Sequence, residues 1–337
     1  MKIAIDGMGG DHAPFEIVKG CVQASEKIEH EIYIIGREDE IENELKKYTY
    51  NKEQIKVVHA ADVITMEDAP VKAVRTKTDS SLVKGLNMVK NGEADLLISA
   101  GNSGAIMAGG LFILGRISGI DRPAIATTYP ILGRGMSLMV DSGANAECKP
   151  TNLLEFATMG SIYMERVFGI AKPKVGLVNI GTEESKGTTV LKGAHELLSK
   201  SRLNFIGNVE ARQVPDGVCD VIVCDGFVGN VILKLTEGLA WSILQLIKKK
   251  FTQGFLPKMG ALLLSNKIKE MKQEFDYSEY GGAPILGVKG VLLKIHGSSN
   301  ANAVKNAIIK GIPYVENKVV EVIQDSVLEL EEITQSE

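Results

Sequence analysis

Residues 2–27, KIAIDGMGGDHAPFEIVKGCVQASEK, contain a short apolar run, a glycine-rich loop and a helical pattern in immediate succession. The nearly continuous apolar run that ends at Asp6 predicts a buried β-strand over 2–6. Gly7, Gly9 and Gly10 then predict a tight loop, after which a helix is expected over 14–28. Strand, loop and helix in this order are typical of a parallel sheet covered by helices.

The same succession recurs along the chain. The predicted strands are continuously apolar rather than alternating, which indicates strands covered on both faces. We therefore predict a three-layer α/β/α sandwich with a mostly parallel sheet. No linker or repeat divides the sequence, so we expect one α/β catalytic domain over 1–337. The predicted strands are 2–6, 32–36, 55–59, 95–99, 123–128, 136–140, 174–180, 203–207 and 220–224, and the predicted helices include 14–28, 79–91, 103–117, 151–168, 187–200, 228–252 and 300–324.

The composition is that of an ordinary globular protein, with 337 residues, 45% hydrophobic and 24% charged. A net charge of −4 argues against a nucleic-acid-binding surface. No apolar run approaches the roughly 18 residues of a membrane span, and the chain starts directly with a strand pattern. We expect a cytoplasmic protein without a signal peptide. The cysteines and histidines show no metal-ligand spacing, so we expect no metal.

Glycine is over-represented, at 35 residues, and gathers directly after predicted strands. The carboxyl ends of parallel strands share one edge of a sheet, where ligands of α/β proteins bind. Glycine lets the backbone approach a ligand, and helix N-termini at this edge attract anions. Together these loops predict a phosphate-like site, although each loop alone is more often a structural turn. The loops are 6–14, 99–104, 179–187, 225–230 and 296–300.

Two common nucleotide-binding signatures are absent. Gly7 and Gly9 begin a G-x-G-x-x-G pattern, but its last position is His12. Lys186 precedes Gly187 instead of following it, so no G-x-x-x-x-G-K-[ST] loop is formed. We expect no nucleotide cofactor.

Eight motifs together resemble the PlsX family, the bacterial phosphate acyltransferases of phospholipid synthesis. The resemblance runs in order from residue 1 to about residue 325. The motifs are DGMGGDHAP (6–14), SAGNSGA (99–105), GRISGIDRPA (115–124), NIGTEESKG (179–187), NFIGNVEAR (204–212), DGFVGNV (225–231), YGGAPILG (280–287) and HGSSNANAV (296–304).

The resemblance implies a reversible transfer of a fatty acyl group from acyl-[acyl-carrier protein] to inorganic phosphate, which gives acyl phosphate and free carrier protein. It also implies a fold like the isocitrate/isopropylmalate dehydrogenases and phosphotransacetylases, and a homodimer without organic cofactor. The protein is expected to associate peripherally with the cytoplasmic membrane, where a membrane-bound glycerol-3-phosphate acyltransferase would receive the product.

The chemistry asks for few side chains. Phosphate attacks the thioester itself, and the leaving thiol has a pKa near about 8–9, so the site must supply an anion cradle, alignment and donors to the oxyanion. With the resemblance, Lys186 is the first catalytic candidate, as a cation that neutralises the phosphate or polarises the carbonyl. The alternative is that Lys186 is an ordinary solvated lysine in a loop. Asn230 is a donor to the oxyanion or a helix cap. Asp11 and His12 are acid/base candidates or surface residues, and Asp6 is a strand-end hydrogen-bond acceptor.

The glycine loops also supply candidate phosphate-binding residues. His296 and the residues after it can bind phosphate at a helix N-terminus or simply cap that helix. The candidates are Gly9, Gly10, Gly101, Asn102, Ser103, His296, Ser298, Ser299 and Asn300.

Residues 248–272 form a basic and apolar segment, with seven lysines and one acid, Glu270, for a net charge of +6. Gly254 and Pro257 interrupt its helical pattern, so we expect two helices that meet at a protruding tip. Such a tip suits an anionic membrane surface, an acidic carrier protein or a dimer contact. The membrane-binding candidates are Phe255, Leu256, Lys258, Met259, Leu262 and Leu263.

Two alternatives stay open. One is a short-chain phosphotransacetylase that uses acyl-coenzyme A, and the other is a membrane-associated scaffold without turnover. The basic segment favours the carrier-protein enzyme over the first, and the intact motifs around Lys186 and Asn230 favour it over the second.

Overall fold

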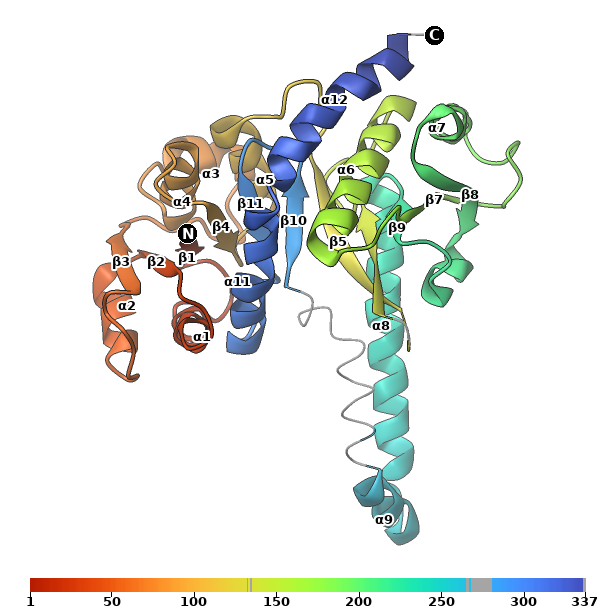
Figure 1. Cartoon of the computed structure of the whole chain (residues 1–337). Coiled ribbons are helices and arrows are strands. Elements are labelled where there is room, and N and C mark those ends of the chain that lie inside the picture. Colours follow the sequence, from red (N-terminus) through yellow and green to blue (C-terminus); the bar gives the residue numbers. More distant parts are fainter. Residues whose placement is uncertain (132, 134, 265–266, 268–280, 336–337) are drawn as a thin grey trace.

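The computed structural model describes residues 1–131, 133, 135–264, 267 and 281–335. Within these residues, eleven strands form a continuous sheet in the order β3-β2-β1-β4-β11-β10-β5-β6-β9-β7-β8 (Figure 1). The strands are β1 (Lys2–Asp6), β2 (Glu31–Gly36), β3 (Ile55–His59), β4 (Leu96–Ser99), β5 (Ala124–Ile131), β6 (Gly135–Val140), β7 (Lys174–Asn179), β8 (Asn204–Glu210), β9 (Val221–Val223), β10 (Ala283–Leu286) and β11 (Val291–Lys294).

The sheet consists of two parallel sets of strands that run in opposite directions. β1, β2, β3, β4 and β11 are mutually parallel, and β6, β7, β8 and β9 form a second parallel set. β10 and β5 join the sets through three antiparallel pairings, β11–β10, β10–β5 and β5–β6. The sheet is therefore mostly parallel, as predicted, but its glycine loops lie at the carboxyl ends of two opposed sets.

Helices cover both faces of the sheet and complete the predicted α/β/α sandwich. One apolar core lies under α1, α2, α6, α7, α11 and α12, and a second lies under α3, α4, α5 and the π-helical turn η1. Their bounds are α1 (Phe15–Ser25), α2 (Glu38–Leu45), α3 (Pro70–Thr76), α4 (Ser81–Lys90), α5 (Ser103–Gly109), η1 (Gly110–Leu114), α6 (Pro150–Phe168), α7 (Thr189–Lys200), α11 (Ala301–Glu316) and α12 (Val319–Gln335), and a short 3-10 turn, η2, covers Ala211–Asp216.

The continuously apolar strand β1 explains why both faces must be covered. Ile3 and Ile5 point into the core beneath α1, whereas Ala4, between them, belongs to the opposite core. All three side chains are almost fully buried. Since neighbouring residues of a strand face opposite sides, a strand without polar positions is stable only between two helical layers.

Helix α8 (Gly226–Phe251) begins on the sheet and ends far from it. Its first turns contact β5 and β6, and the remainder projects from the sheet as an arm, with α9 (Phe255–Leu263) at its tip (Figure 1). The predicted break is confirmed, because Gly254 adopts a φ of 95° between the two helices. Pro257 is tolerated in the first turn of α9, where backbone N–H groups have no helical partner. Lys269, Glu270 and Lys272 of the predicted segment lie outside the described residues.

The expectation that no segment is long and apolar enough to span a membrane needs correction for α8. The helix is long and apolar enough, by length and composition, to cross a membrane, although only 6% of its most apolar window is buried inside the protein. Lys234 and Glu237 interrupt the apolar run, yet the mean hydropathy over the window stays high. Because its first turns pack on the sheet, length and apolarity do not by themselves make it a membrane span.

The helix predicted over 300–324 is also wrong as a single element. It is divided into α11 and α12 at Asn317 and Lys318, where Lys318 adopts a φ of 51°. The helix predicted over 103–117 starts correctly at Ser103 but widens into the π-helical η1. Strands β10 and β11 were not among those predicted, although they join the two halves of the sheet.

Candidate active site

A pocket of about 480 Å³ lies where the carboxyl ends of the two strand sets approach each other. The loops after β1, β4 and β11 contribute Asp11, Gly101 and His296. From the opposed set, the loop after β6 contributes Gly143, and the start of α8 contributes Asn230. The remaining lining residues are Met66, Ser103, Ile125, Thr127, Thr128, Ser142, Leu233, Lys234, Glu237, Gly282, Ala283, Lys294, Ile295, Gly297, Ser299 and Ala303.

The loops after β1 and β4 are held together by buried Asp6. Its carboxylate accepts a hydrogen bond from the Ser99 hydroxyl at 2.6 Å, and the same hydroxyl accepts one from the Gly101 N–H at 3.1 Å. A Cβ atom at Gly9 would lie only 2.5 Å from the Asp6 carboxylate and 2.8 Å from the Gly101 nitrogen. Burial raises the pKa of Asp6, while hydrogen bonds from Ser81 and Ser99 oppose that rise. Asp6 is therefore a structural acceptor, as the sequence predicts, and Gly9 is needed for close approach.

The third loop of this set joins the first through the backbone. The Asp11 N–H donates to the Gly297 carbonyl at 2.8 Å. Gly10 has a φ of 99°, and a Cβ atom there would lie 2.9 Å from the same carbonyl oxygen. Asp11 consequently lines the pocket, whereas exposed His12 is not among its lining residues.

On the opposite side, buried Asp141 organises the loop after β6. Its carboxylate accepts hydrogen bonds from the backbone N–H groups of Gly143, Ala144 and Asn145 at 2.7–3.1 Å. Burial raises the pKa of Asp141, and the N–H groups of Ala144 and Asn145 oppose that rise. This cradle presents Ser142 and Gly143 to the pocket, beside Asn230. Sequence analysis missed Asp141, although DSGAN directly after an apolar strand was an available signal.

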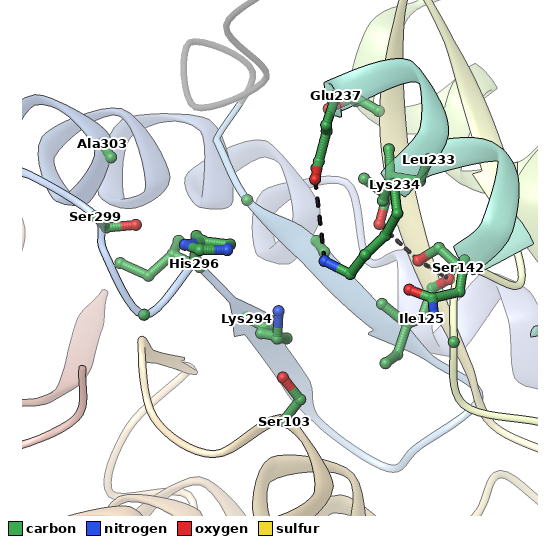
Figure 2. Close-up of a pocket in the computed structure, with 18 of the residues that line it drawn as sticks. Ser103, Ile125, Ser142, Leu233, Lys234, Glu237, Lys294, His296, Ser299 and Ala303 are labelled. Atoms are coloured by element: carbon green, nitrogen blue, oxygen red, sulfur yellow. Dashed lines mark hydrogen bonds and ion pairs between the residues drawn. The ribbon is translucent and has the colours of Figure 1, made fainter. Parts of the chain in front are cut away.

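Two lysines enter the pocket from different elements, Lys234 from α8 and Lys294 from the end of β11 (Figure 2). The Lys234 ammonium lies 3.9 Å from a Glu237 carboxylate oxygen. Burial, together with the charge of Lys234, lowers the pKa of Lys294. Among the described residues, no carboxylate lies within ion-pair distance of Lys294. A second negative charge bound between these lysines would relieve their repulsion.

His296 lies beside the lysines and contributes a polar ring (Figure 2). Its Nδ1 accepts a hydrogen bond from the Ser298 N–H at 3.2 Å and lies 2.8 Å from the Ser298 hydroxyl. In the neutral ring the proton is therefore on Nε2. Burial and the charge of Lys294 lower the pKa of His296, which favours this neutral form near neutral pH.

Five predicted binding residues do not line the pocket: Gly9, Gly10, Asn102, Ser298 and Asn300. The Asn102 side chain accepts from the Ala105 N–H, which caps α5, and donates to the Thr65, Met66 and Asp68 carbonyls. Asn300 caps α11 by accepting from the Ala303 N–H at 3.0 Å. The capping alternative thus describes Asn300, and Asn102, predicted only as a binding residue, is also a helix cap. Asn102 still serves the pocket, because it fixes the loop that carries Met66.

Lys186 is not among the residues that line the pocket. It lies in the loop after β7 with 48% of its side chain exposed, 3.9 Å from a Glu183 carboxylate oxygen. The Asn179 side chain donates to the Lys186 carbonyl and shapes this loop. Lys186 and Asn230 thus follow neighbouring strands, β7 and β9, but the structure does not bring both into one pocket. The cations in the pocket are those that sequence analysis missed.

Within the described ranges, no group of three His, Cys, Asp or Glu side chains is placed to hold a metal ion.

The predicted tip residues Met259, Leu262 and Leu263 are exposed by 50%, 76% and 83%. The side chains of Phe255, Leu256 and Lys258 lie outside the described structure.

Comparison with known proteins gives matches over almost the whole chain. Residues 1–322 match the model of a family described as fatty acid synthesis protein. A protein named phosphate acyltransferase from Alkaliphilus oremlandii is 58% identical over 330 residues, which cover 98% of each chain. Its namesake from Clostridium acetobutylicum is 52% identical and covers 98% of this chain and 100% of the relative.

Solved structures share the fold at low sequence identity. A phosphotransacetylase from Streptococcus pyogenes has a TM-score of 0.60 at 20% identity, and the match covers 94% of both chains. A 4-hydroxythreonine-4-phosphate dehydrogenase from Klebsiella pneumoniae has a TM-score of 0.55 at 11% identity and covers 94% of this chain and 99% of the dehydrogenase. The predicted α/β sandwich and its similarity to phosphotransacetylases are confirmed, and the dehydrogenase that matches is a 4-hydroxythreonine-4-phosphate dehydrogenase.

Proposed function

Because the chain belongs to the PlsX family of fatty acid synthesis proteins, whose curated relatives are named phosphate acyltransferase, we propose that its acyl donor is a fatty acyl thioester of acyl-carrier protein. The chain is an acyltransferase that acts on phosphate. The non-catalytic scaffold is set aside, because the relatives named for this activity match 98% of the chain. The donor and a role of the acyl phosphate in phospholipid synthesis are the proposed part.

The observation that carries the proposal is a pocket that two lysines enter, of which Lys294 has no carboxylate within ion-pair distance among the described residues. Glu237 also lines the pocket, lies 3.9 Å from Lys234 and offsets part of the positive charge. Phosphate, largely a dianion near neutral pH, binds between Lys234 and Lys294. The Ser103 hydroxyl, which also lines the pocket, adds a donor to the anion cradle. The negative charge of the bound anion reduces the repulsion between the two lysine ammonium groups, and this reduction favours anion binding.

The reaction then follows from alignment. A phosphate oxygen attacks the thioester carbonyl carbon, forming the new C–O bond and a tetrahedral oxyanion. The Asn230 amide donates to that oxyanion. As the oxyanion collapses, the C–S bond breaks and the carrier thiolate leaves, to be protonated by water. Its thiol pKa near about 8–9 makes a strong general acid unnecessary.

Lys186 does not line the pocket, but it remains part of this proposal as a third lysine, in addition to Lys234 and Lys294. Its loop follows β7, next to β9, from whose end α8 carries Asn230 and Lys234. Asp11 is proposed as a polar wall of the pocket. His12 does not line the pocket, and we propose no acid/base role for it in the transfer.

The donor is tested by incubating the protein with phosphate and either long-chain acyl-carrier protein, long-chain acyl-coenzyme A or acetyl-coenzyme A. Acyl phosphate is trapped as the hydroxamate. We expect the highest kcat/KM with acyl-carrier protein. Lys294→Met should lower kcat/KM by about 10²–10³, the usual loss of one transition-state donor. Exposed Lys289→Met is the matched control. A preference for acetyl-coenzyme A would instead identify a short-chain phosphotransacetylase.

We also propose that the arm formed by α8 and α9 attaches the protein to the cytoplasmic membrane surface. Support comes from the exposure of Met259, Leu262 and Leu263 at the tip and from the lysines at 248–250, at the end of α8. Apolar insertion and attraction of lysines to anionic headgroups act together in such contacts. A long-chain acyl phosphate released there is close to a membrane-bound glycerol-3-phosphate acyltransferase, its proposed consumer.

A homodimer is proposed from the arm itself. Large apolar side chains recur on α8 at four- and three-residue steps and are 46–69% exposed. Such a stripe indicates a helix face that packs against another surface. A second copy of the same helix is the proposed partner. The stripe consists of Leu235, Leu239, Ile243 and Leu246.

A further inference from the structure

A second cavity of about 280 Å³ adjoins the pocket, and we call it the side groove. The pocket and the side groove share Ser103, Ile125 and Gly143 as lining residues. These residues come from the start of α5, from β5 and from the loop after β6. The pocket and the side groove are therefore adjacent at these three residues.

The lining of the side groove differs in chemistry from that of the pocket. Ser103 is the one polar residue that lines the side groove. The other lining residues are apolar or are glycines, and none of the lining residues carries a charge. Val71 and Phe112 are 43% and 50% exposed although both are large hydrophobic residues. Apolar surface of this kind, next to a functional pocket, indicates a ligand surface.

The part of the side groove formed by Leu111 and Phe112 has an unusual helix geometry. After α5 the chain makes a π-helical turn over η1, closed by a hydrogen bond of 3.0 Å from the Gly115 N–H to the Gly110 carbonyl. Leu111 and Phe112, both in the side groove, belong to that turn. π-turns are common at helix C-termini, so this turn contributes the placement of the two side chains in the side groove.

We propose that the side groove holds the alkyl chain of the acyl donor, with the thioester carbonyl in the pocket. This inference rests on the proposed function and names the subsite that would recognise the fatty part of the substrate. The small side chains of Ala108 and Ala144 leave the space that the chain occupies, and Met107, Leu111 and Phe112 contact it. Each methylene that leaves water there strengthens binding about fourfold, so long chains are favoured over short ones.

The pantetheine arm is the other part of the thioester that must leave the pocket, and the side groove suits it poorly. That arm carries two amides, and buried amides need hydrogen-bond partners. The side groove offers one side-chain hydroxyl, that of Ser103. An alkyl chain needs no such partner, so the composition of the walls selects the chain.

Chain-length kinetics test the subsite. Ala144→Phe would fill the side groove near its junction with the pocket, and Phe112→Ala would remove its outer wall. Ala146→Phe, on exposed Ala146 in the same loop, is the matched control because Ala146 lines neither cavity. For each variant, kcat/KM is measured with hexadecanoyl and butanoyl thioesters of the same carrier protein, and folding is checked by circular dichroism.

We expect Ala144→Phe to lower kcat/KM for the hexadecanoyl donor at least tenfold while the butanoyl value stays within about twofold. Phe112→Ala should lower the hexadecanoyl value by about fourfold or more, and the control should alter neither. Equal losses for both donors would assign the side groove to the pantetheine arm and overturn the inference, as would unchanged hexadecanoyl activity in both folded variants. Absence of acyl phosphate with wild-type protein and every donor would instead refute the proposed function.

Discussion

At the scale of single residues, the pocket depends on a lysine that is partly withdrawn from water. Lys294 ends β11 and shares the pocket with Lys234, and burial together with that second charge lowers its pKa. Lys294 must carry its proton to hold phosphate. Since its pKa is lowered, the proton is lost at a lower pH than from an ordinary lysine, and the binding contribution disappears as pH rises through this lowered pKa.

The first prediction concerns this alkaline limb. In wild-type protein, kcat/KM for phosphate should fall on the alkaline side at a pH below the ordinary lysine pKa of about 10.4. Lys294→Arg should move the fall to higher pH, because a guanidinium stays protonated up to a pKa of about 12 or more. The measurement is a pH profile of acyl phosphate formation at low phosphate, with Lys289→Arg as control. An identical profile in Lys294→Arg would assign the limb to another group.

The second prediction concerns Lys186. We expect Lys186→Ala to lower turnover by at least about a hundredfold, the usual cost of losing one donor to a transition state, and to leave the fold intact. Lys192→Ala, an exposed lysine in the following helix, should have wild-type turnover. Nearly normal acyl phosphate formation by Lys186→Ala, with an unchanged circular dichroism spectrum, would remove this loop from the mechanism and leave the charge of the site to Lys234 and Lys294.

At the scale of elements, sequence predicted strands well where burial on both faces dictates an apolar run, as in β1, β2 and β9. β10 and β11 were missed although β4, which is equally short, was predicted; β10 contains Pro284, a residue that argues against a strand. That omission has a functional consequence, since Lys294 is the last residue of β11. A lysine at the end of an unrecognised strand looks like an ordinary surface residue in the sequence.

The glycine loops were predicted to lie together, and the loops after β1, β4 and β11 do. Sequence could not reveal that β6 and β9 run the other way, because strand direction depends on pairings between distant segments. For the same reason it could not distinguish the loop with Asn230, which reaches the pocket, from the loop with Lys186, which does not line it.

The third prediction belongs to the arm. Leu262→Glu with Leu263→Glu should release the protein from anionic liposomes, because two exposed leucines that can insert are replaced by charges that anionic headgroups repel. Acyl phosphate formation in solution should persist, since neither residue lines the pocket. Ile206→Glu, which changes a 42% exposed residue on β8, is the matched control and should still co-sediment. Co-sedimentation of the double variant at the wild-type level would show that the tip is not the anchor.

At the scale of the whole molecule, one helix links the pocket to the arm. α8 begins with Asn230, Lys234 and Glu237 at the pocket and ends with three consecutive lysines beside the tip. Between these ends its apolar stripe is exposed along the projecting part of the helix (Figure 1). A long helix exposed on most of its surface is poorly stabilised by its own fold, because most helical stability comes from packing of an apolar face. Association of two arms would supply that packing.

The fourth prediction follows from this argument. Wild-type protein should have twice the mass of one chain in sedimentation equilibrium, and Leu239→Glu with Leu246→Glu should have the mass of one chain. Each leucine loses about 1.5–3 kcal/mol of burial per protomer, and the new carboxylates would be buried without partners. Ile206→Glu, away from the arm, should leave the dimer intact. If wild-type protein sediments as a single chain at micromolar concentration, the stripe does not serve self-association, and membrane or carrier protein remains to cover it. If the double variant becomes monomeric and also loses long-chain activity, the arms position the start of α8 at the pocket, and dimerisation is part of the catalytic architecture.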